Sequence, residues 1–197
     1  MKWPLVRGSY EVLNEKGYVG IIFLPQGARD DEHTDWDTPP EWPEDVAMIG
    51  TLQTENEGIK DVILNTMSSY AIDRLAIVGK NDVEGHRSGM TLLNLWKNGI
   101  DDDGRVIGDE VGAIPYPFGK PKDEIHRDKM KRFVNRFREE VTVYNYIGIE
   151  KEKCLPEIEK LCDGNYRVRN IDKELEDLLK DFSQTTQVID IDSLTEM

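Results

Sequence analysis

This sequence of 197 residues lacks a long apolar run and a secretory signal. Its longest apolar stretch, near residues 18–24, is far shorter than the roughly 20 residues that cross a bilayer. The first residues carry no apolar block of the kind that directs secretion. We therefore expect a cytoplasmic protein with no membrane span.

Cysteine is scarce, with only Cys154 and Cys162. Eight residues apart on one expected helix, their Cα atoms would lie about 12 Å apart, which is too far for a disulfide. Two unpaired thiols are consistent with a reducing cytoplasm.

Positive charge is also in deficit, with 25 Lys and Arg against 39 Asp and Glu and a net charge of -14. Such a chain is repelled by nucleic acid and by anionic membranes, so neither is an expected partner. Hydrophobic residues still make up 38% of the sequence, too many for a disordered acidic chain.

The negative charge is concentrated in two segments. Residues 30–45 hold eight acids and no Lys or Arg, and residues 172–197 hold eight acids against two lysines. The rest of the chain has equal numbers of acids and bases. The first segment also contains three prolines, Trp36 and Trp42, which predicts a loop that its tryptophans pin to the body or use to contact a partner.

Apolar spacing predicts strands that alternate with helices. Strands are expected at 18–24, 46–49, 75–78 and 141–149, and helices at 54–67, 88–96, after Pro121, at 150–161 and at 171–182. Thr54 and Glu57 have the spacing of a capping box at the start of the first helix. The order predicts an α/β fold, a Rossmann-like three-layer sandwich with a mostly parallel sheet. We expect a domain over 1–165, with 30–45 as an insert, and an acidic helix and tail over 166–197.

Two loops at strand ends are expected to carry the chemistry, because ligands of such sheets lie beyond the carboxyl ends of the strands. Residues 50–58 and 79–89 are rich in glycine and small polar residues, and each precedes a helix. Neither has the spacing of a P-loop or of a dinucleotide fingerprint. A phosphate-bearing ligand bound by backbone N–H groups remains one interpretation.

His86 is the most informative of the three histidines, because it lies between Gly85 and Gly89, whereas His33 and His126 fall in charged surroundings. A lone histidine cannot build a zinc site, which needs three or four protein ligands. It can be structural, or it can be the axial ligand of a metal held in a macrocycle. Glu84-x-His86-x-x-Gly89 resembles the Asp-x-His-x-x-Gly loop of cobalamin-binding modules.

Several motifs in order make the resemblance more specific. They are Trp3-Pro4, Gly8-x-Tyr10, Thr54-Glu55-Asn56-x-Gly58-Ile59, Gly85-His86-x-x-Gly89, Asn98-Gly99-Ile100-Asp101-x-x-Gly104-Arg105-Val106-Ile107-Gly108 and Gly112-Ala113-Ile114-Pro115. Together they resemble the A subunit of tetrahydromethanopterin S-methyltransferase, a one-carbon enzyme of methanogenic archaea.

The resemblance implies a corrinoid-binding domain that shuttles a methyl group from methyl-tetrahydromethanopterin to coenzyme M through cobalt. His86 corresponds to the lower axial ligand of the cobalt. No catalytic acid or base is implied. The implied cofactor-binding residues are Thr54, Glu55, Asn56, Gly58, Gly85, His86, Ser88, Gly89, Gly112, Ala113, Ile114 and Pro115.

The C-terminus departs from the family, in which a membrane helix stands where this chain has an acidic polar tail. We therefore expect a soluble corrinoid carrier that works with partner methyltransferase subunits. Two alternatives remain open from the sequence. One is a module that binds a nucleotide or phosphate ligand, and the other is a non-catalytic paralogue that acts through protein contacts at Trp36 and Trp42.

Overall fold

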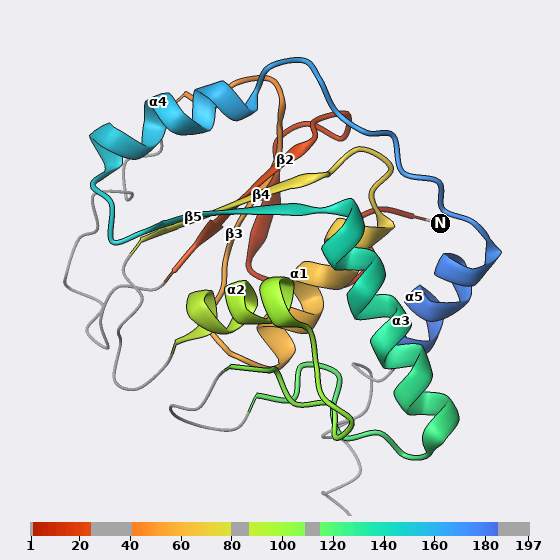
Figure 1. Cartoon of the computed structure of the whole chain (residues 1–197). Helices are drawn as coiled ribbons and strands as arrows, with labels where there is room; N and C mark the ends of the chain where they lie inside the picture. The colour runs from red at the N-terminus through yellow and green to blue at the C-terminus, as the bar shows by residue number, and fades with distance from the viewer. Residues whose placement is uncertain (1, 25–40, 80–86, 109–114, 185–197) are drawn as a thin grey trace, which may run out of the picture.

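The computed structural model describes residues 2–24, 41–79, 87–108 and 115–184, and they form one sheet with helices on both faces (Figure 1). The strands are β1 (Tyr10–Val12), β2 (Val19–Phe23), β3 (Val46–Thr51), β4 (Arg74–Gly79) and β5 (Thr142–Ile147). The helices are α1 (Glu57–Ser68), α2 (Ser88–Asn98), α3 (Glu124–Glu140), α4 (Lys151–Leu161) and α5 (Lys173–Gln184).

The sheet has the strand order β1-β3-β2-β4-β5. Strands β2 to β5 run parallel, and β1 pairs antiparallel with β3 at the edge. The predicted α/β fold with a mostly parallel sheet is therefore confirmed. β1 was not predicted from the sequence.

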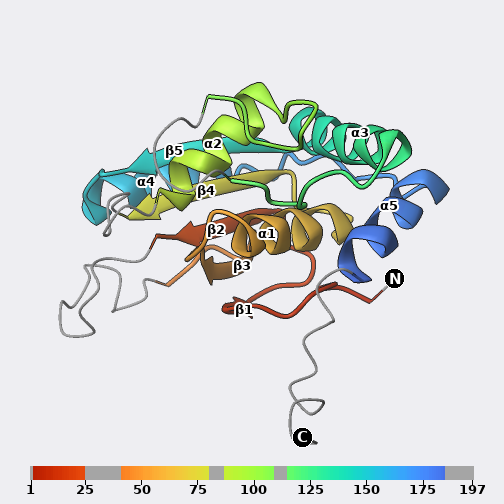
Figure 2. The ribbon, with the colours of Figure 1, turned by 90° about the horizontal axis from the view of Figure 1, so that it is seen from below.

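Side chains alternate between the two faces of the sheet, as the period of a strand requires. In β4, Leu75 and Ile77 join the larger apolar cluster, whereas Ala76 and Val78 join the smaller one. Helices α1, α2, α3 and α5 supply the larger cluster and α4 supplies the smaller one. The result is the expected three-layer arrangement, with one face covered more heavily than the other (Figures 1 and 2).

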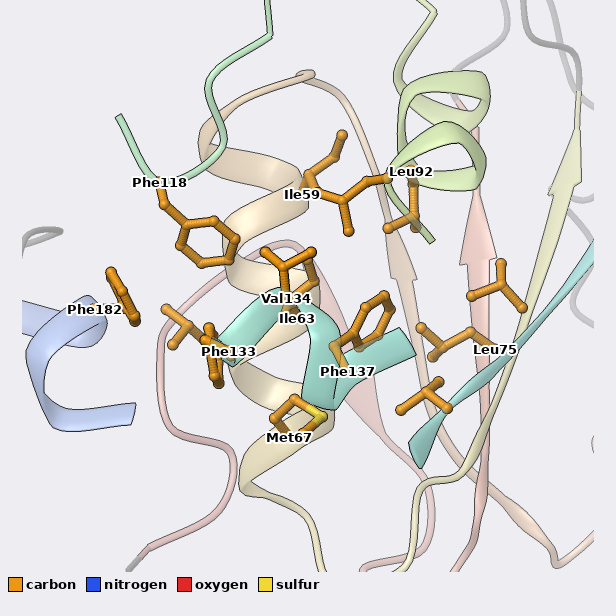
Figure 3. Close-up of a cluster of buried hydrophobic side chains, with 14 of the residues drawn as sticks. Ile59, Ile63, Met67, Leu75, Leu92, Phe118, Phe133, Val134, Phe137 and Phe182 are labelled. Carbon is orange, nitrogen blue, oxygen red and sulfur yellow. The ribbon is translucent and has the colours of Figure 1, made fainter. Parts of the chain in front are cut away.

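The larger cluster draws its side chains from several helices and from the sheet. Figure 3 shows Ile59 and Ile63 of α1, and Val134 and Phe137 of α3, among the side chains of this cluster. These helices follow the predicted apolar spacing, and each fully buried aliphatic or aromatic side chain contributes about 1.5–3 kcal/mol. The burial of these side chains packs α1 against the sheet. The N-terminus of α1 then lies close to the carboxyl end of β3, which directly precedes it in the chain.

The start of α1 differs from the prediction. The helix begins at Glu57 rather than at Thr54, and its N-cap, Asn56, makes no capping hydrogen bond with its side chain. Thr54 Oγ1 instead accepts a hydrogen bond from Gly58 N over 2.9 Å. The predicted capping box is therefore wrong, because residues 54–56 belong to the loop.

α5 packs on the domain through its apolar face. Leu175, Leu178, Leu179 and Phe182 are buried, and the Phe182 ring lies 5.1 Å from that of Phe118 and 5.3 Å from that of Phe133. The helix contacts α1 and α3 (Figures 2 and 3). A division into units 1–165 and 166–197 stays a prediction.

The acidic insert is described only from residue 41 onward. The Trp42 ring lies 6.1 Å from the Phe23 ring and packs against the smaller cluster. That contact is the one expected of a loop pinned by a tryptophan. Trp36 lies outside the described residues.

Candidate functional site

The carboxyl ends of β2, β3 and β4 meet at one edge of the sheet. Leu52 N donates to Phe23 O over 2.9 Å, and Leu24 N donates to Val78 O over 2.9 Å, so the three strand ends are joined by backbone bonds. β4 ends at Gly79, whose φ of +103° is rarely adopted by residues with a side chain. The chain leaves the sheet here, at the point where the sequence predicts a ligand site.

Glu55 connects the loop after β3 to the start of α2. Its Oε1 accepts a hydrogen bond from the backbone N of Arg87 over 2.6 Å. Next along the chain, the buried hydroxyl of Ser88 donates to Leu52 O over 3.0 Å. These two bonds fix the position of the residues that directly follow His86.

Asn56 connects the same loop to a third segment. Its Oδ1 accepts a hydrogen bond from the backbone N of Tyr116 over 2.7 Å. The preceding residue, Pro115, accepts from Val106 N over 3.2 Å. The side chain that could have capped α1 thus holds the end of the Gly112–Pro115 motif.

Gly58 and Gly89 allow close packing. A Cβ at Gly58 would lie 2.9 Å from Leu52 Cδ1, and one at Gly89 would lie 2.6 Å from Leu24 Cδ1 and 3.0 Å from Ile147 Cδ1. Their lack of a side chain lets α1 and α2 approach the strand ends. Both motif glycines therefore have a packing role in the described structure.

The structure brings together seven of the twelve residues named from the sequence. Thr54, Glu55, Asn56, Gly58, Ser88, Gly89 and Pro115 lie on segments joined by the bonds above. Gly85, His86, Gly112, Ala113 and Ile114 lie outside the described residues. Across the described ranges, no three His, Cys, Asp or Glu side chains form a group that could hold a metal ion.

Sequence reasoning missed Arg87 and Tyr116, which contribute backbone N–H groups to this edge. Any residue except proline offers that donor, so no side-chain pattern could have identified them. The nearest signal was their place next to His86 and Pro115.

Fold and site together define an open, doubly wound α/β domain. Counted in chain order, its four parallel strands lie in the order 2-1-3-4, and loops gather where that order reverses, which is where such domains bind ligands. The sequence profile of the family described as the A subunit of tetrahydromethanopterin S-methyltransferase matches residues 1–164. The chain belongs to this family.

Individual relatives agree with the family profile. A Methanosarcina barkeri protein, provisionally named as the A subunit of methyltransferase Mtx, is 33% identical over 147 residues, which are 75% of this chain and 63% of the relative. The A subunit of tetrahydromethanopterin S-methyltransferase from Methanocaldococcus jannaschii is 34% identical over 149 residues, 76% of this chain and 56% of the relative. A Methanothermobacter thermautotrophicus protein, named as a second A subunit of the same enzyme, is 32% identical over 149 residues, 75% of this chain and 70% of the relative.

The matched region spans about 63% and 56% of the first two of these relatives. Among the helices that the structure describes, none combines the length and apolar character needed to cross a bilayer.

Proposed function

We propose that this chain is a corrinoid carrier for methyl transfer, with the loops at the carboxyl edge of the sheet holding the cofactor. The observation that carries the proposal is the pair of bonds from Glu55 to Arg87 N and from Asn56 to Tyr116 N. They hold Arg87 and Tyr116 against the loop that carries one motif assigned to the cofactor by the resemblance. Arg87 lies within a second such motif, and Tyr116 directly follows a third. In this proposal the domain acts in the cytoplasm.

The chemistry of the available donors fits a corrinoid better than a bare metal ion. In the described part of the chain no group of three His, Cys, Asp or Glu side chains could hold a metal ion. In this proposal a macrocycle fills most of the coordination positions of the cobalt. His86 would then supply one neutral imidazole nitrogen as the lower ligand. A bound corrinoid supplies a cobalt centre that accepts a methyl group and gives it up.

The residues around His86 would position its ring. Glu55 holds Arg87, the next residue, and Ser88 is anchored to Leu52. An imidazole that binds a metal usually donates its other N–H to an acceptor, for which Glu84 is our candidate. Acid would protonate the imidazole and detach it from the metal.

The same edge supports a phosphate ligand less well. The first turn of α1 carries Glu57, and Thr54 already accepts a hydrogen bond from Gly58 N. A carboxylate at this end of a helix repels an anion, which the helix N-terminus would otherwise attract.

Partner subunits are part of the proposal, because family members are named as subunits of a methyltransferase. Methyl-tetrahydromethanopterin as donor and coenzyme M as acceptor follow from the resemblance. The alternative is a chain that binds no cofactor and contacts its partners through Trp36 and Trp42. The experiment must distinguish this alternative from the corrinoid carrier.

The test is binding of hydroxocobalamin to the full chain, followed by gel filtration and visible spectroscopy. We expect retained cobalamin with the spectrum of an imidazole-ligated cobalt, and His86→Ala should remove that spectrum. His126→Ala is the matched control, because His126 is on α3 and its Nδ1 accepts from Lys122 N. Failure to retain cobalamin, or an unchanged spectrum in His86→Ala, would refute the proposal.

A further inference from the structure

A cavity of about 240 Å³ lies between α1, the sheet and the N-terminal segment. Its lining comes from α1, from the strands β1 to β4 and from the loop after β3. Thr54 and Gly58 reach it from the carboxyl edge, but its other walls are residues outside the cofactor set that the family resemblance implies. Most of the cavity lining therefore lies outside the implied cofactor set, and only Thr54 and Gly58 belong to both.

The outer wall of the cavity is fixed by hydrogen bonds. Asn65 on α1 accepts from Val6 N over 2.9 Å and donates to Val6 O over 3.1 Å. Trp3 Nε1 donates to Asn65 O over 2.8 Å, and the Tyr10 hydroxyl donates to Val6 O over 2.8 Å. The N-terminal segment is thereby held over α1, and the polar groups of this wall satisfy one another.

Asp61 is the exception among the polar groups that line the cavity. Its Oδ1 is buried and has no hydrogen-bond partner in the described part of the chain. The neighbouring Lys60 does not neutralise it by contact, because Lys60 Nζ pairs with Glu57 over 2.5 Å. A buried acceptor without a donor is unfavourable, and native structures contain few of them.

The remaining lining is mainly apolar. Ile22, Met48, Val62, Ile72 and Leu75 contribute side chains, and Gly20 and Gly50 contribute bare backbone. The volume lies below the roughly 300–1,000 Å³ of pockets for drug-sized ligands. A space of this size suits a small apolar molecule, and the carboxylates of Glu57 and Asp61 in its lining disfavour an anion.

We propose that this cavity binds a small, mainly apolar molecule with one ammonium or N–H group, which donates a hydrogen bond to Asp61. The apolar body fills the space beside Val62 and Met48, and the donor satisfies Asp61 Oδ1. The proposal concerns a second ligand and does not depend on the corrinoid.

Benzylamine is a suitable probe, because it joins a small apolar ring to an ammonium group, and benzoate is its anionic counterpart. Titration of the full chain without corrinoid would be followed through backbone amide chemical shifts in NMR. We expect benzylamine to bind with a Kd of about 1 mM or tighter and to shift Gly20, Gly50, Asp61 and Asn65. Benzoate should shift none of them.

Two variants and a control assign the contact. Asp61→Asn removes the charge with little change in shape and should weaken benzylamine about tenfold. Val62→Phe should reduce the space and weaken benzylamine as well, whereas Asp128→Asn, on α3 and away from the cavity lining, should have no effect.

Shifts in other parts of the chain, or an affinity that Asp61→Asn leaves unchanged, would overturn the proposal. An absence of binding by the unmodified chain would also overturn it. Cobalamin retention is measured separately, so failure here leaves the corrinoid proposal standing.

Discussion

The two ends of the parallel strands are held together in different ways. At the amino ends, arginine side chains each bind several carbonyl and carboxylate oxygens. At the carboxyl ends, single side chains from the 54–56 loop bind single backbone N–H groups. The first arrangement joins elements through many bonds on one residue, and the second joins loops through single bonds on each side chain.

Arg169 is the centre of the amino edge. Its Nη1 donates to Thr66 O over 2.7 Å and to Ser69 O over 2.6 Å, and its Nη2 donates to Ile72 O over 2.8 Å. Its Nε donates to Glu140 over 2.7 Å, and the residue is only 4% exposed. One side chain thus joins the end of α1, the start of β4 and the end of α3.

Arg74 and Arg136 extend this arrangement. Arg74 donates to Leu161 O, to Asp163 and to Asn165 O, which ties the chain after α4 to the start of β4. Arg136 donates to Asn170 O and pairs with Asp172, directly before α5. The described hydrogen bonds of these three arginines therefore gather at the amino edge, whereas the carboxyl edge is the one that we propose for ligand binding.

The largest effect is expected for Arg169→Met. The change removes the Arg169 donor from the carbonyls of Thr66, Ser69 and Ile72, although Thr66 O keeps Ser69 N as a donor. It also removes one of the two arginine partners of Glu140, so it should destabilise the fold by about 3 kcal/mol. Chemical denaturation of the full chain measures this. Arg167→Met is the control at an exposed arginine, and equal losses in the two variants would erase the proposed contrast between the edges.

A smaller effect is expected for Glu55→Ala at the carboxyl edge. Loss of the bond to Arg87 N should weaken cobalamin binding about tenfold and cost about 1 kcal/mol of stability. Glu55→Gln keeps an acceptor oxygen and should restore most of the binding. Glu57→Gln, in the first turn of α1, serves as the control. A loss of stability without a loss of cobalamin affinity would show that Glu55 does not position the loop for the cofactor.

The smallest effect is expected for Asp61→Asn, and it should depend on pH. Burial raises the pKa of Asp61 to about 6, opposed by Lys60 and assisted by Glu57. An unfolded aspartate titrates near pH ~4, so between about pH 4 and 6 the folded chain holds a proton that the unfolded chain has lost. Stability therefore falls through this group as pH rises across that window.

Asp61→Asn should remove this pH dependence. Because Asp61 is only half-buried and partly screened by solvent, we expect a gain of about 1 kcal/mol at pH 7 and none near pH 4. Denaturation at both pH values measures the difference. The charged and titratable groups that interact with Asp61, namely Lys60, Glu57 and Tyr10, are unchanged in the variant. A gain of equal size at both pH values would contradict this explanation.

The sequence predicted the helices well because their apolar spacing is long enough to be clear. The stripe of Met130, Phe133, Val134 and Phe137 on α3 is buried as expected. It did not predict β1, because three residues carry too short a pattern and their place depends on pairing with β3. The sequence pattern placed the start of α1 too early, because Thr54 is a common N-cap residue. In the structure its Oγ1 accepts a hydrogen bond from Gly58 N, and the helix begins only at Glu57.

The site was predicted as a set of loops but not as a set of contacts. The parallel sheet and the family motifs together predict a shared edge for residues 54–58, 87–89 and 115. That Glu55 and Asn56 hold backbone groups of Arg87 and Tyr116 depends on three-dimensional approach, which sequence spacing cannot supply. The cavity beside Asp61 was missed for the same reason, since an aspartate on a helix ordinarily faces water.

The docking of α5 has a consequence for handling this domain as a unit. The match to the family profile ends at residue 164, yet Leu175, Leu178, Leu179 and Phe182 belong to the main core. A piece cut at the family boundary would expose the surfaces of α1 and α3 that these side chains cover, and open apolar surface promotes aggregation. Truncations of this chain should therefore be cut, and chimaeras joined, after residue 184. The domain then keeps α5, whose side chains are part of its larger cluster.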